Sequence, residues 1–304
     1  KDNLKKSIIN KINDIICELV KEREDIKKIY RVSISANTVM LHMLLGVDTE
    51  TIAKSPYRPT FLKSLNIKGK DMGIEVNSEG IVTLLPSASG YVGADIISGA
   101  VATGFNKKKH KAIFIDIGTN GEILAISNSK IVGTSTAAGP AFEGMNISCG
   151  CRAEAGAIDT FKIENGNIIL TTIDNEEPKG ICGSGLIDIA SEFIKNKIIL
   201  KSGKLNNRLE GNLGKHIRDK KFYITDDIYI SQGDIRQIQL AKGAIAAGVI
   251  MLLDNINVSI EEIEEVIVAG SFGYHLNPEN LKNIGIIPKG FKGSISFTGN
   301  SSVE

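Results

Sequence analysis

Cysteine is scarce in this chain of 304 residues, which has four cysteines, at positions 17, 149, 151 and 182. They are too few and too unevenly spaced for a disulfide framework or a tetrahedral zinc site, so the sequence predicts reduced, structural thiols. Excess charge of one sign is also missing, because 36 basic residues balance 35 acidic ones and leave a net charge of +1. Without a global electrostatic field, binding to nucleic acid is not expected.

Long hydrophobic runs are missing as well. No window holds 18 consecutive apolar residues, which argues against a membrane span. The first ten residues lack the apolar core and cleavage site of a secretory signal. We therefore expect a cytoplasmic protein with no membrane partner. A hydrophobic content of 42% and a charged content of 23% are typical of a globular fold, and the length predicts two lobes.

Helical and strand patterns alternate in the first third of the chain. Apolar residues at helical spacing predict a helix over residues 4–20. Strands are predicted at 31–35 and 81–85, and further helices from Asn37 to Gly46 and from about Gly90 to Gly104. The expected order is therefore helix, strand, helix, strand, helix.

A different pattern begins at residue 112. Three short strands joined by a glycine-containing turn and an Asn-Ser turn predict a β-meander, and a glycine-rich stretch with weaker strands follows. Further on, the sequence predicts a helix opening at 180–185, a long helix over 234–254, a strand at 265–270, a short helix and a last strand at 294–298.

The two halves resemble offset copies of one α/β unit, a mixed five-stranded sheet flanked by helices, although no residue-level repeat is visible. We expect a first, incomplete lobe in residues 1–108 and a second lobe in 109–304, with insertions near 136–176 and 200–233. In the first lobe the missing meander would leave a long unpaired sheet edge. The sequence therefore predicts a segment of a longer protein.

The motif DIGTNGE at residues 116–122 is the sharpest functional signal. Gly118 and Gly121 have no Cβ, so backbone N–H groups of a tight hairpin can approach phosphate oxygens, and the Thr119 and Asn120 side chains can donate as well. Asp116 would face Mg²⁺ through water, because Mg²⁺ keeps several waters and takes one or two carboxylates. A hairpin with a convenient glycine turn is the purely structural alternative.

A second glycine-rich motif, VAGSFG at 268–273, follows an apolar strand. Open α/β sheets place ligands outside the carboxyl ends of such strands. The motif is neither G-x-G-x-x-G nor a Walker loop, so neither a dinucleotide site nor a P-loop is supported.

Two further loops carry polar residues. The string AAGPAFEG contains Glu143, and GICGSG opens a predicted helix. A helix N-terminus formed by Gly183, Ser184 and Gly185 can present free N–H groups and the positive end of the helix dipole to a phosphate. A simple cap by Ser184 is an equally good interpretation. Cys182 beside them is expected to be a small buried hydrophobe.

The long predicted helix keeps Gly243 and Gly248 in its interior, each costing about 1 kcal/mol relative to alanine. This cost suggests close packing or a nearby ligand. Arg236, Gln239 and Lys242 near the start of the helix are placed to reach a nucleotide. A solvated polar face is the alternative interpretation.

In their order along the chain, several strings together resemble the ATPase domain of reductive activators of corrinoid proteins, within the superfamily of acetate and sugar kinases, heat-shock chaperones and actin. The resemblance spans about residues 30–300 and rests on SANTVMLHMLLG, LLPSASGYVGADI, IDIGTNGEI, TAAGPAFEG, GICGSGLIDIA, QGDIRQIQLAKGAI and VAGSFG. It implies an actin-like ATPase fold of two ribonuclease-H-like lobes with mixed five-strand sheets, the first lobe being incomplete here.

The same resemblance implies an activity and a set of site residues. The family uses ATP to drive an electron from an iron–sulfur cluster to an inactive Co(II) corrinoid on a methyltransferase partner, restoring Co(I). The resemblance assigns the phosphate hairpin to Asp116, Gly118, Thr119 and Asn120, the adenosine loop to Gly270, Ser271 and Gly273, and the helix beside the adenine to Arg236, Gln239 and Lys242. Glu143 and residues 183–185 belong to family strings without an assigned role.

The implied cofactors are ATP and Mg²⁺, and the implied partners are a corrinoid protein or a corrinoid-dependent methyltransferase and a second copy of the chain. Two family features are missing from the sequence: the D-x-G-T hairpin of the opening lobe and the cysteine set of a 2Fe-2S domain. The cluster is therefore expected in an upstream domain, and the segment by itself is expected to bind nucleotide poorly.

Three other functions stay open at this stage. A small-molecule phosphotransferase of the same superfamily would need a carboxylate base, for which Asp95 is the candidate. An ATPase that activates a radical dehydratase would need two cysteines near the nucleotide; Cys182 is well placed, but no cysteine follows it. A docking and dimerisation platform would have lost catalysis altogether.

Overall fold

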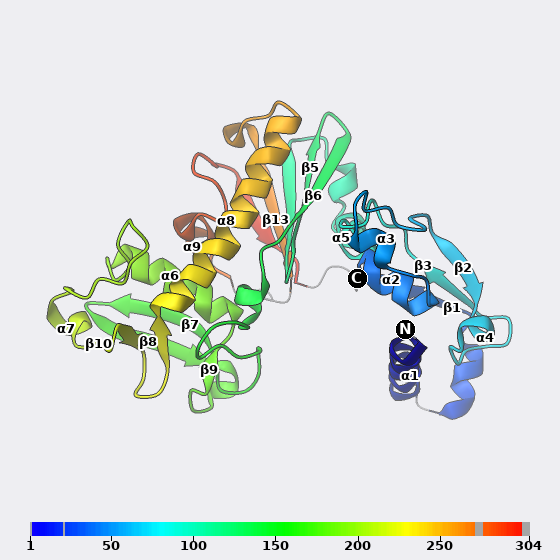
Figure 1. Ribbon diagram of the computed structural model, residues 1–304, viewed down its shortest axis with the longest axis horizontal. Helices are drawn as coiled ribbons and strands as arrows, with labels where there is room; N and C mark the ends of the chain where they lie inside the picture. Colours follow the sequence, from blue (N-terminus) through cyan, green and yellow to red (C-terminus); the bar gives the residue numbers. More distant parts are fainter. Residues whose placement is uncertain (1, 21, 271–275, 300–304) are drawn as a thin grey trace. The chain divides into compact units, whose positions relative to one another are not determined.

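The computed structural model describes residues 2–20, 22–270 and 276–299 (Figure 1). The chain forms two compact units. Of the described residues, those up to 103 belong to the smaller unit and those from 104 to 299 belong to the larger one. Each unit has its own hydrophobic core.

The smaller unit is built on a three-stranded sheet of order β1-β3-β2, with β1 parallel and β2 antiparallel to β3. Its elements are α1 (Asp2–Leu19), η1 (Arg23–Lys28), β1 (Arg31–Ile34), α2 (Thr38–Leu45), α3 (Glu50–Ala53), β2 (Leu65–Lys68), α4 (Gly69–Met72), β3 (Ile81–Leu84) and α5 (Ala94–Ala102). Asn37 caps α2 by accepting the Met40 N–H at 2.9 Å, and Gly46 ends it with a left-handed φ of 74°. The helices and strands predicted here from residue patterns are therefore confirmed.

The smaller unit has one strand that the sequence did not predict. Strand β2 pairs with β3 along its full length, and β1 and β2 are the outer strands of the sheet. The segment Leu65–Lys68 was missed because four residues inside a loop rich in proline and lysine are too short to show a period. The described part of this unit therefore has three strands, where the repeated unit was expected to have five.

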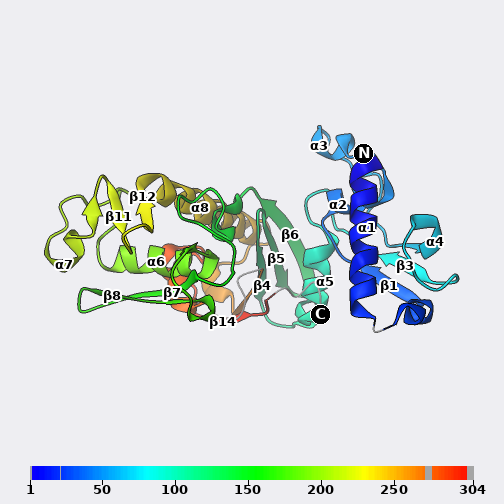
Figure 2. The ribbon, with the colours of Figure 1, turned by 90° about the horizontal axis from the view of Figure 1, so that it is seen from below.

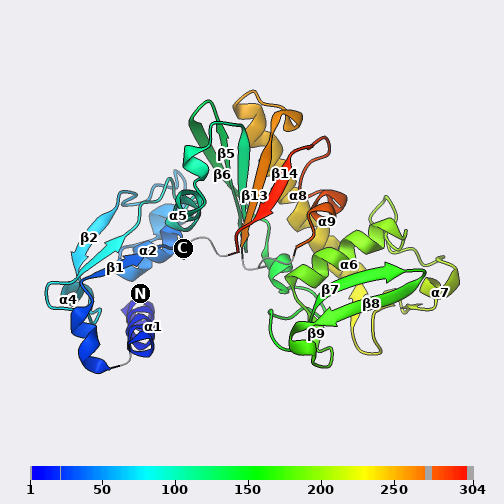
Figure 3. The same cartoon turned by 180° about the vertical axis from the view of Figure 1, so that it is seen from behind.

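The larger unit contains the mixed five-stranded sheet that the sequence predicted, in the order β14-β13-β4-β5-β6. Its strands are β4 (Ala112–Ile117), β5 (Gly121–Ser127), β6 (Lys130–Thr136), β13 (Glu265–Gly270) and β14 (Ser294–Phe297). The first three form the expected meander, and β13 pairs in parallel with both β4 and β14. The opposite views in Figures 1 and 3 show α8 (Gln232–Asn255) covering one face of this sheet.

By length and composition α8 could cross a bilayer. In the structure one face of α8 packs on β5 and β6, and Gly248 explains how closely it approaches the sheet. A Cβ added at Gly248 would lie 2.4 Å from Thr136 Cγ2 and 2.9 Å from Ile123 Cδ1. Close packing is therefore confirmed for Gly248. An added Cβ at Gly243 would meet no atom within 4 Å, so the alternative of a nearby ligand stays a prediction there.

A second layer of the larger unit is inserted after β6. It contains η3 (Pro140–Glu143), β7 (Ala157–Glu164), β8 (Asn167–Thr172), η4 (Ile173–Asn175), β9 (Gly180–Ile181), α6 (Gly183–Lys195), α7 (Gly211–Gly214), β10 (Ile217–Arg218), β11 (Lys221–Tyr223) and β12 (Tyr229–Ser231). The unit is completed by η2 (Phe105–Lys107), η5 (Ile260–Glu262) and α9 (Pro278–Ile284). Figure 2 shows the β7–β8 hairpin running beside α6.

Candidate functional site

The hairpin between β4 and β5 is closed by its own backbone. The Gly118 N–H donates to the Asn120 carbonyl at 3.0 Å, and the Gly139 N–H donates to the Thr119 carbonyl at 2.9 Å. The backbone N–H groups of Thr119 and Asn120 donate to no acceptor within the described part of the chain. The Thr119 hydroxyl donates to Glu143 Oε2 at 2.9 Å. The hairpin therefore brings two unpaired donors close to a carboxylate.

Glu143 lines a cavity of about 280 Å³ in the larger unit. We call this cavity the phosphate cavity. It is lined by Phe142, Glu143, Met145, Arg152, Ala153, Cys182, Gly183 and Ser184. Three residues singled out from the sequence therefore meet around one space, although 40 residues separate Glu143 from Gly183. Arg152 was missed, because nothing in its sequence context distinguishes it from a solvated arginine.

The N-terminus of α6 at this cavity has no side-chain cap. Its N-cap residue is Cys182, which makes no capping hydrogen bond. The Cys182 thiol is 2% exposed and donates to the Ile158 carbonyl at 3.3 Å. Ser184 does not cap the helix either, because its Oγ lies 3.3 Å from Cys182 Sγ. The predicted burial of Cys182 is confirmed, and the interpretation of Ser184 as a simple cap is wrong.

An uncapped helix start leaves backbone donors for a ligand. The first four N–H groups of a helix have no partner within the helix, and the dipole adds partial positive charge at the same end. No described residue accepts from the N–H groups of Gly183, Ser184 and Gly185. With Arg152 on the cavity wall, the arrangement favours an anion such as a phosphate.

At two of the glycines predicted to contact a phosphate, Gly121 and Gly185, protein atoms fill the side on which a Cβ would lie. A Cβ at Gly121 would lie 2.8 Å from Thr136 Oγ1 and 2.9 Å from Ile245 Cγ1, and one at Gly185 would lie 2.2 Å from the Ile158 carbonyl oxygen. Gly270 has a φ of 131°. At Gly118, by contrast, the nearest atom to an added Cβ is Glu143 Oε1 at 3.4 Å.

Alanine substitutions at Gly118 and Gly121 separate these two roles. We expect Gly121→Ala to lower the free energy of unfolding by about 2 kcal/mol, because the added Cβ overpacks the contact between α8 and the sheet. For Gly118→Ala we expect a change within about 0.5 kcal/mol. Urea titration followed by circular dichroism measures both. Equal losses of unfolding free energy in the two variants would contradict the different roles assigned to Gly118 and Gly121.

Other predicted site residues lie apart from the phosphate cavity. Asp116 pairs with Ala269 and Glu122, and strand alternation puts its side chain on the face of Phe114, opposite Ile115. It lines neither of the two cavities described in this subsection. The predicted adenosine-loop residues 271 and 273, Ser271 and Gly273, lie outside the described residues.

A larger cavity of about 640 Å³, which we call the lysine cavity, lies between α6, α8 and α9. Its lining includes Gln239 and Lys242, whereas Arg236 is exposed outside it. Six lysines surround an apolar floor without any lining carboxylate: Lys195, Lys197, Lys201, Lys242, Lys282 and Lys289. Only Lys195 and Lys282 among them form an ion pair with another described residue. The cavity is therefore suited to a ligand with both an apolar and an anionic part.

The thiols of the larger unit serve local packing. Cys149 Sγ lies 3.8 Å from the Asp227 carbonyl, and burial raises the pKa of the Cys151 thiol. Within the described ranges, no group of three or more His, Cys, Asp or Glu side chains is arranged to hold a metal ion.

Comparison with known proteins gives a consistent relationship over the whole chain. Residues 110–304 match the C-terminal domain of RACo, the ASKHA domain, and residues 1–108 match the RACo middle region. The corrinoid activation enzyme RamQ of Eubacterium limosum is 32% identical over 303 residues, which cover 93% of this chain and 50% of RamQ. The [Co(II) methylated amine-specific corrinoid protein] reductase of Methanosarcina barkeri is 24% identical, with coverages of 92% and 55%.

A solved structure agrees with this relationship. The reductive activator for corrinoid, iron–sulfur protein superposes with a TM-score of 0.83 at 34% identity, covering 99% of this chain and 50% of that one. The chain thus spans about half the length of the relatives it matches. The mixed α/β fold of actin-like ATPases expected from the sequence is confirmed. The chain therefore belongs to the RACo family and contains its ASKHA domain.

Proposed function

We propose that this chain is the nucleotide-binding part of a reductive activator of a corrinoid protein. In the proposed reaction, one electron passes from a reduced 2Fe-2S cluster, held by a part of the protein outside this chain, to Co(II), which becomes Co(I). ATP supplies the driving force for this uphill transfer. The proposal is supported by family membership and by the activities named for the two relatives, both of which concern corrinoid proteins.

The phosphate cavity carries the proposal. The uncapped start of α6 and Arg152 supply donors and positive charge around this cavity, which matches a polyphosphate tail. The Thr119–Asn120 hairpin, which is bonded to the lining residue Glu143, is proposed to add two backbone donors beside it. Glu143, which accepts the Thr119 hydroxyl at 2.9 Å, is proposed to orient the attacking water or a water bound to Mg²⁺. Asp116 is proposed to reach Mg²⁺ through water, and Mg²⁺ would neutralise phosphate charge when bound.

The lysine cavity is proposed to take the base and ribose. Its isoleucine floor would bury a flat apolar ring, while Gln239 and Lys242 on α8 supply polar contacts to the sugar or the proximal phosphate. Nucleotide state would then favour or release the corrinoid partner by changing the relative population of two conformations. A homodimer and a cytoplasmic location are part of the same proposal.

Substitution of Lys242 tests the proposed base end of the site. We expect Lys242→Ala to weaken ATP binding about tenfold, because one charge-assisted contact is lost. Arg236→Ala is the matched control: it removes a cation from the same helix but outside the cavity, and we expect ATP affinity to stay unchanged. Fluorescence titration with a labelled ATP analogue measures both. Equal effects of the two substitutions would rule out Lys242 as a specific contact.

Calorimetry with ATP and Mg²⁺ tests the proposed function itself, first on this chain and then on the full-length protein. We expect heat of binding, and ATP turnover by the full-length protein that a Co(II) corrinoid protein stimulates. Turnover stimulated by a small acid or sugar, with a phosphorylated product, would instead identify a phosphotransferase. A platform without catalysis would show no binding, and iron bound by this chain would favour a dehydratase activator.

The phosphotransferase alternative depends on Asp95. This residue belongs to the smaller unit, where its carboxylate accepts the Ile96 N–H at 3.0 Å, and burial raises its pKa. Asp95→Asn is therefore a useful second variant: loss of a phosphorylated product in that variant would support the alternative, whereas the reductive activator does not need Asp95 as a base.

A further inference from the structure

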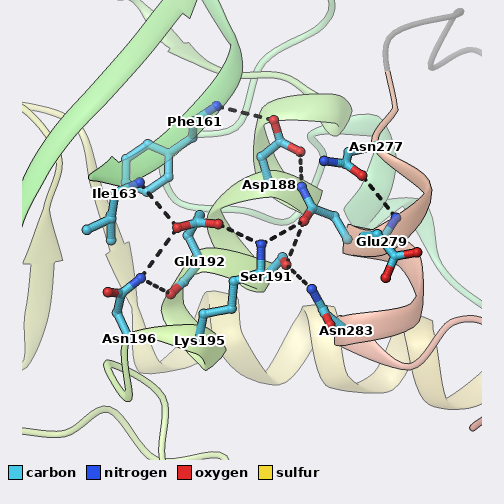
Figure 4. Close-up of polar contacts among 11 residues, drawn as sticks. Phe161, Ile163, Asp188, Ser191, Glu192, Lys195, Asn196, Asn277, Glu279 and Asn283 are labelled. Atoms are coloured by element: carbon cyan, nitrogen blue, oxygen red, sulfur yellow. Dashed lines mark hydrogen bonds and ion pairs between the residues drawn. The ribbon is translucent and has the colours of Figure 1, made fainter. Parts of the chain in front are cut away.

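Helix α6 carries a buried polar stripe on an otherwise apolar face. Asp188, Ser191, Glu192 and Lys195 follow one another at helical spacing, and the first three are 8%, 0% and 8% exposed. Burying two carboxylates is costly unless each is paired and hydrogen-bonded. Each of these carboxylates accepts one hydrogen bond from a backbone N–H of a strand and another from a polar side chain (Figure 4).

The backbone N–H groups that bond to the two carboxylates belong to one edge of β7. Strand β9 pairs with Ala157 and Ile158, and no other strand in the described part of the chain pairs with the rest of that edge. The Phe161 N–H donates to Asp188 Oδ2 at 3.3 Å, and the Ile163 N–H donates to Glu192 Oε2 at 3.2 Å. The i,i+4 spacing on the helix thus matches the i,i+2 spacing of donors on the strand.

On its other side the polar stripe of α6 bonds to α9, mainly through Asn280, which is 4% exposed. Its Nδ2 donates to Asp188 Oδ1 at 2.6 Å, while its Oδ1 accepts from Ser191 Oγ at 2.8 Å and from Lys195 Nζ at 3.3 Å. Asn283 Nδ2 donates to Ser191 Oγ at 3.3 Å. Burial raises the pKa of Asp188, and the hydrogen bonds from Asn280 and Phe161 oppose that rise.

These bonds are directional, which distinguishes them from apolar packing. An all-hydrophobic contact of similar volume would be at least as stable, but it would define the register of two helices less strictly. Register matters here because α9 supplies Lys282, Asn283 and Ile284 to the wall of the lysine cavity, and α6 supplies Lys195. A shift of α9 along α6 would change the shape of that wall.

We propose that Asn280 and Asp188 are positioning residues: their hydrogen bond locks α9 onto α6 and thereby sets the shape of the lysine cavity. The effect on nucleotide rests on the proposed function, since it requires that this cavity receives part of the nucleotide. The locking of α9 onto α6 does not depend on that function and can be measured without any ligand.

A charge swap is the sharpest test. Asn280→Asp places two carboxylates together, and Asp188→Asn leaves two amides facing each other, so each single variant disturbs the pair. In the double variant Asp188→Asn/Asn280→Asp, an amide at 188 accepts the Phe161 N–H and donates to the carboxylate at 280, which still accepts from Ser191 and Lys195. We expect Asn280→Asp to weaken binding of a fluorescent ATP analogue about tenfold and the double variant to recover within about threefold of wild type.

Asn196→Asp is the matched control. Asn196 is the C-cap residue of α6 and its Nδ2 donates to Glu192 Oε2 at 3.4 Å, so the same substitution again places two carboxylates together. Within the described residues, Asn196 has no hydrogen bond to α9. We expect its affinity for the analogue to stay within about twofold of wild type. Similar losses for Asn196→Asp and Asn280→Asp would overturn the proposal.

Hydrogen exchange separates the two possible failures. In Asn280→Asp without nucleotide, we expect amides of residues 281–286 to exchange at least about tenfold faster, with those of β13 unchanged and protection restored in the double variant. Unchanged exchange in α9 would overturn the locking role, whether or not nucleotide binds. Faster exchange with unchanged affinity would overturn the effect on the cavity. Failure of wild-type protein to bind the analogue would refute the proposed nucleotide function, while the exchange result would still decide the locking role.

Discussion

Replacement of Cys182 by aspartate is expected to weaken ATP binding about a hundredfold. The α6 N-terminus is open because its N-cap residue makes no capping bond. An aspartate in that position would accept the N–H groups of the first turn, as N-cap carboxylates commonly do. It would also put a negative charge within a few ångströms of the bound phosphate, and repulsion of about 3 kcal/mol corresponds to that factor.

Cys182→Ser is the matched control for this experiment. It is nearly isosteric and adds no charge, so we expect ATP affinity to fall by less than about fivefold, by partial competition for the same N–H groups. Titration calorimetry gives the affinities, and circular dichroism melting shows whether each variant is folded. A folded Cys182→Asp protein that binds ATP like wild type would exclude the α6 N-terminus as the phosphate site.

Glu143→Gln is expected to lower the ATP turnover number about a hundredfold, the range found when a positioned general base is lost. Glutamine keeps the size of the side chain and can still accept the Thr119 hydroxyl, which donates to Glu143 Oε2 at 2.9 Å. The variant therefore removes the basic carboxylate and leaves the hairpin in place. We expect ATP affinity to change by less than about threefold.

A phosphate-release assay on the full-length protein, with saturating ATP, measures this effect. Glu164→Gln is a suitable control, because Glu164 is an exposed carboxylate at the end of β7 and lines neither cavity. Turnover by Glu143→Gln at the wild-type rate would show that Glu143 is not the base. A large loss of ATP affinity with unchanged turnover would assign it to binding instead.

Local sequence was sufficient wherever one contiguous segment carried the information. The Asn37 cap, the glycine end of α2 and the three-stranded meander all depend on contacts within a few residues, and each was predicted correctly. The same holds for the hairpin at Gly118–Asn120, whose tight turn follows from its glycines. Four-residue strand β2 was missed, since so short a segment is stabilised by its partner β3 more than by its own pattern.

The roles of individual glycines, by contrast, could not be predicted from local sequence. From sequence alone Gly118 and Gly121 looked equivalent, and only packing separates them: Gly121 faces α8 across the sheet, while Gly118 faces the carboxylate of Glu143. Similarly, Gly185 allows α6 to lie against the Ile158 carbonyl. The sequence shows that a glycine has no Cβ, but it does not show whether a ligand or another part of the protein fills the space that the Cβ would take.

By itself, the amino-acid sequence determined the family, the fold class and the segments from which a phosphate site is built, because motifs and periodicity are local properties of the chain. Only the tertiary structure decided that Arg152 joins Glu143 at one cavity, that α6 begins without a cap, and that Asn280 bonds to Asp188. These features depend on packing between separate segments, as between Asp188 and Asn280, which are 92 residues apart, and the energies depend on burial and distance, which residue order does not contain.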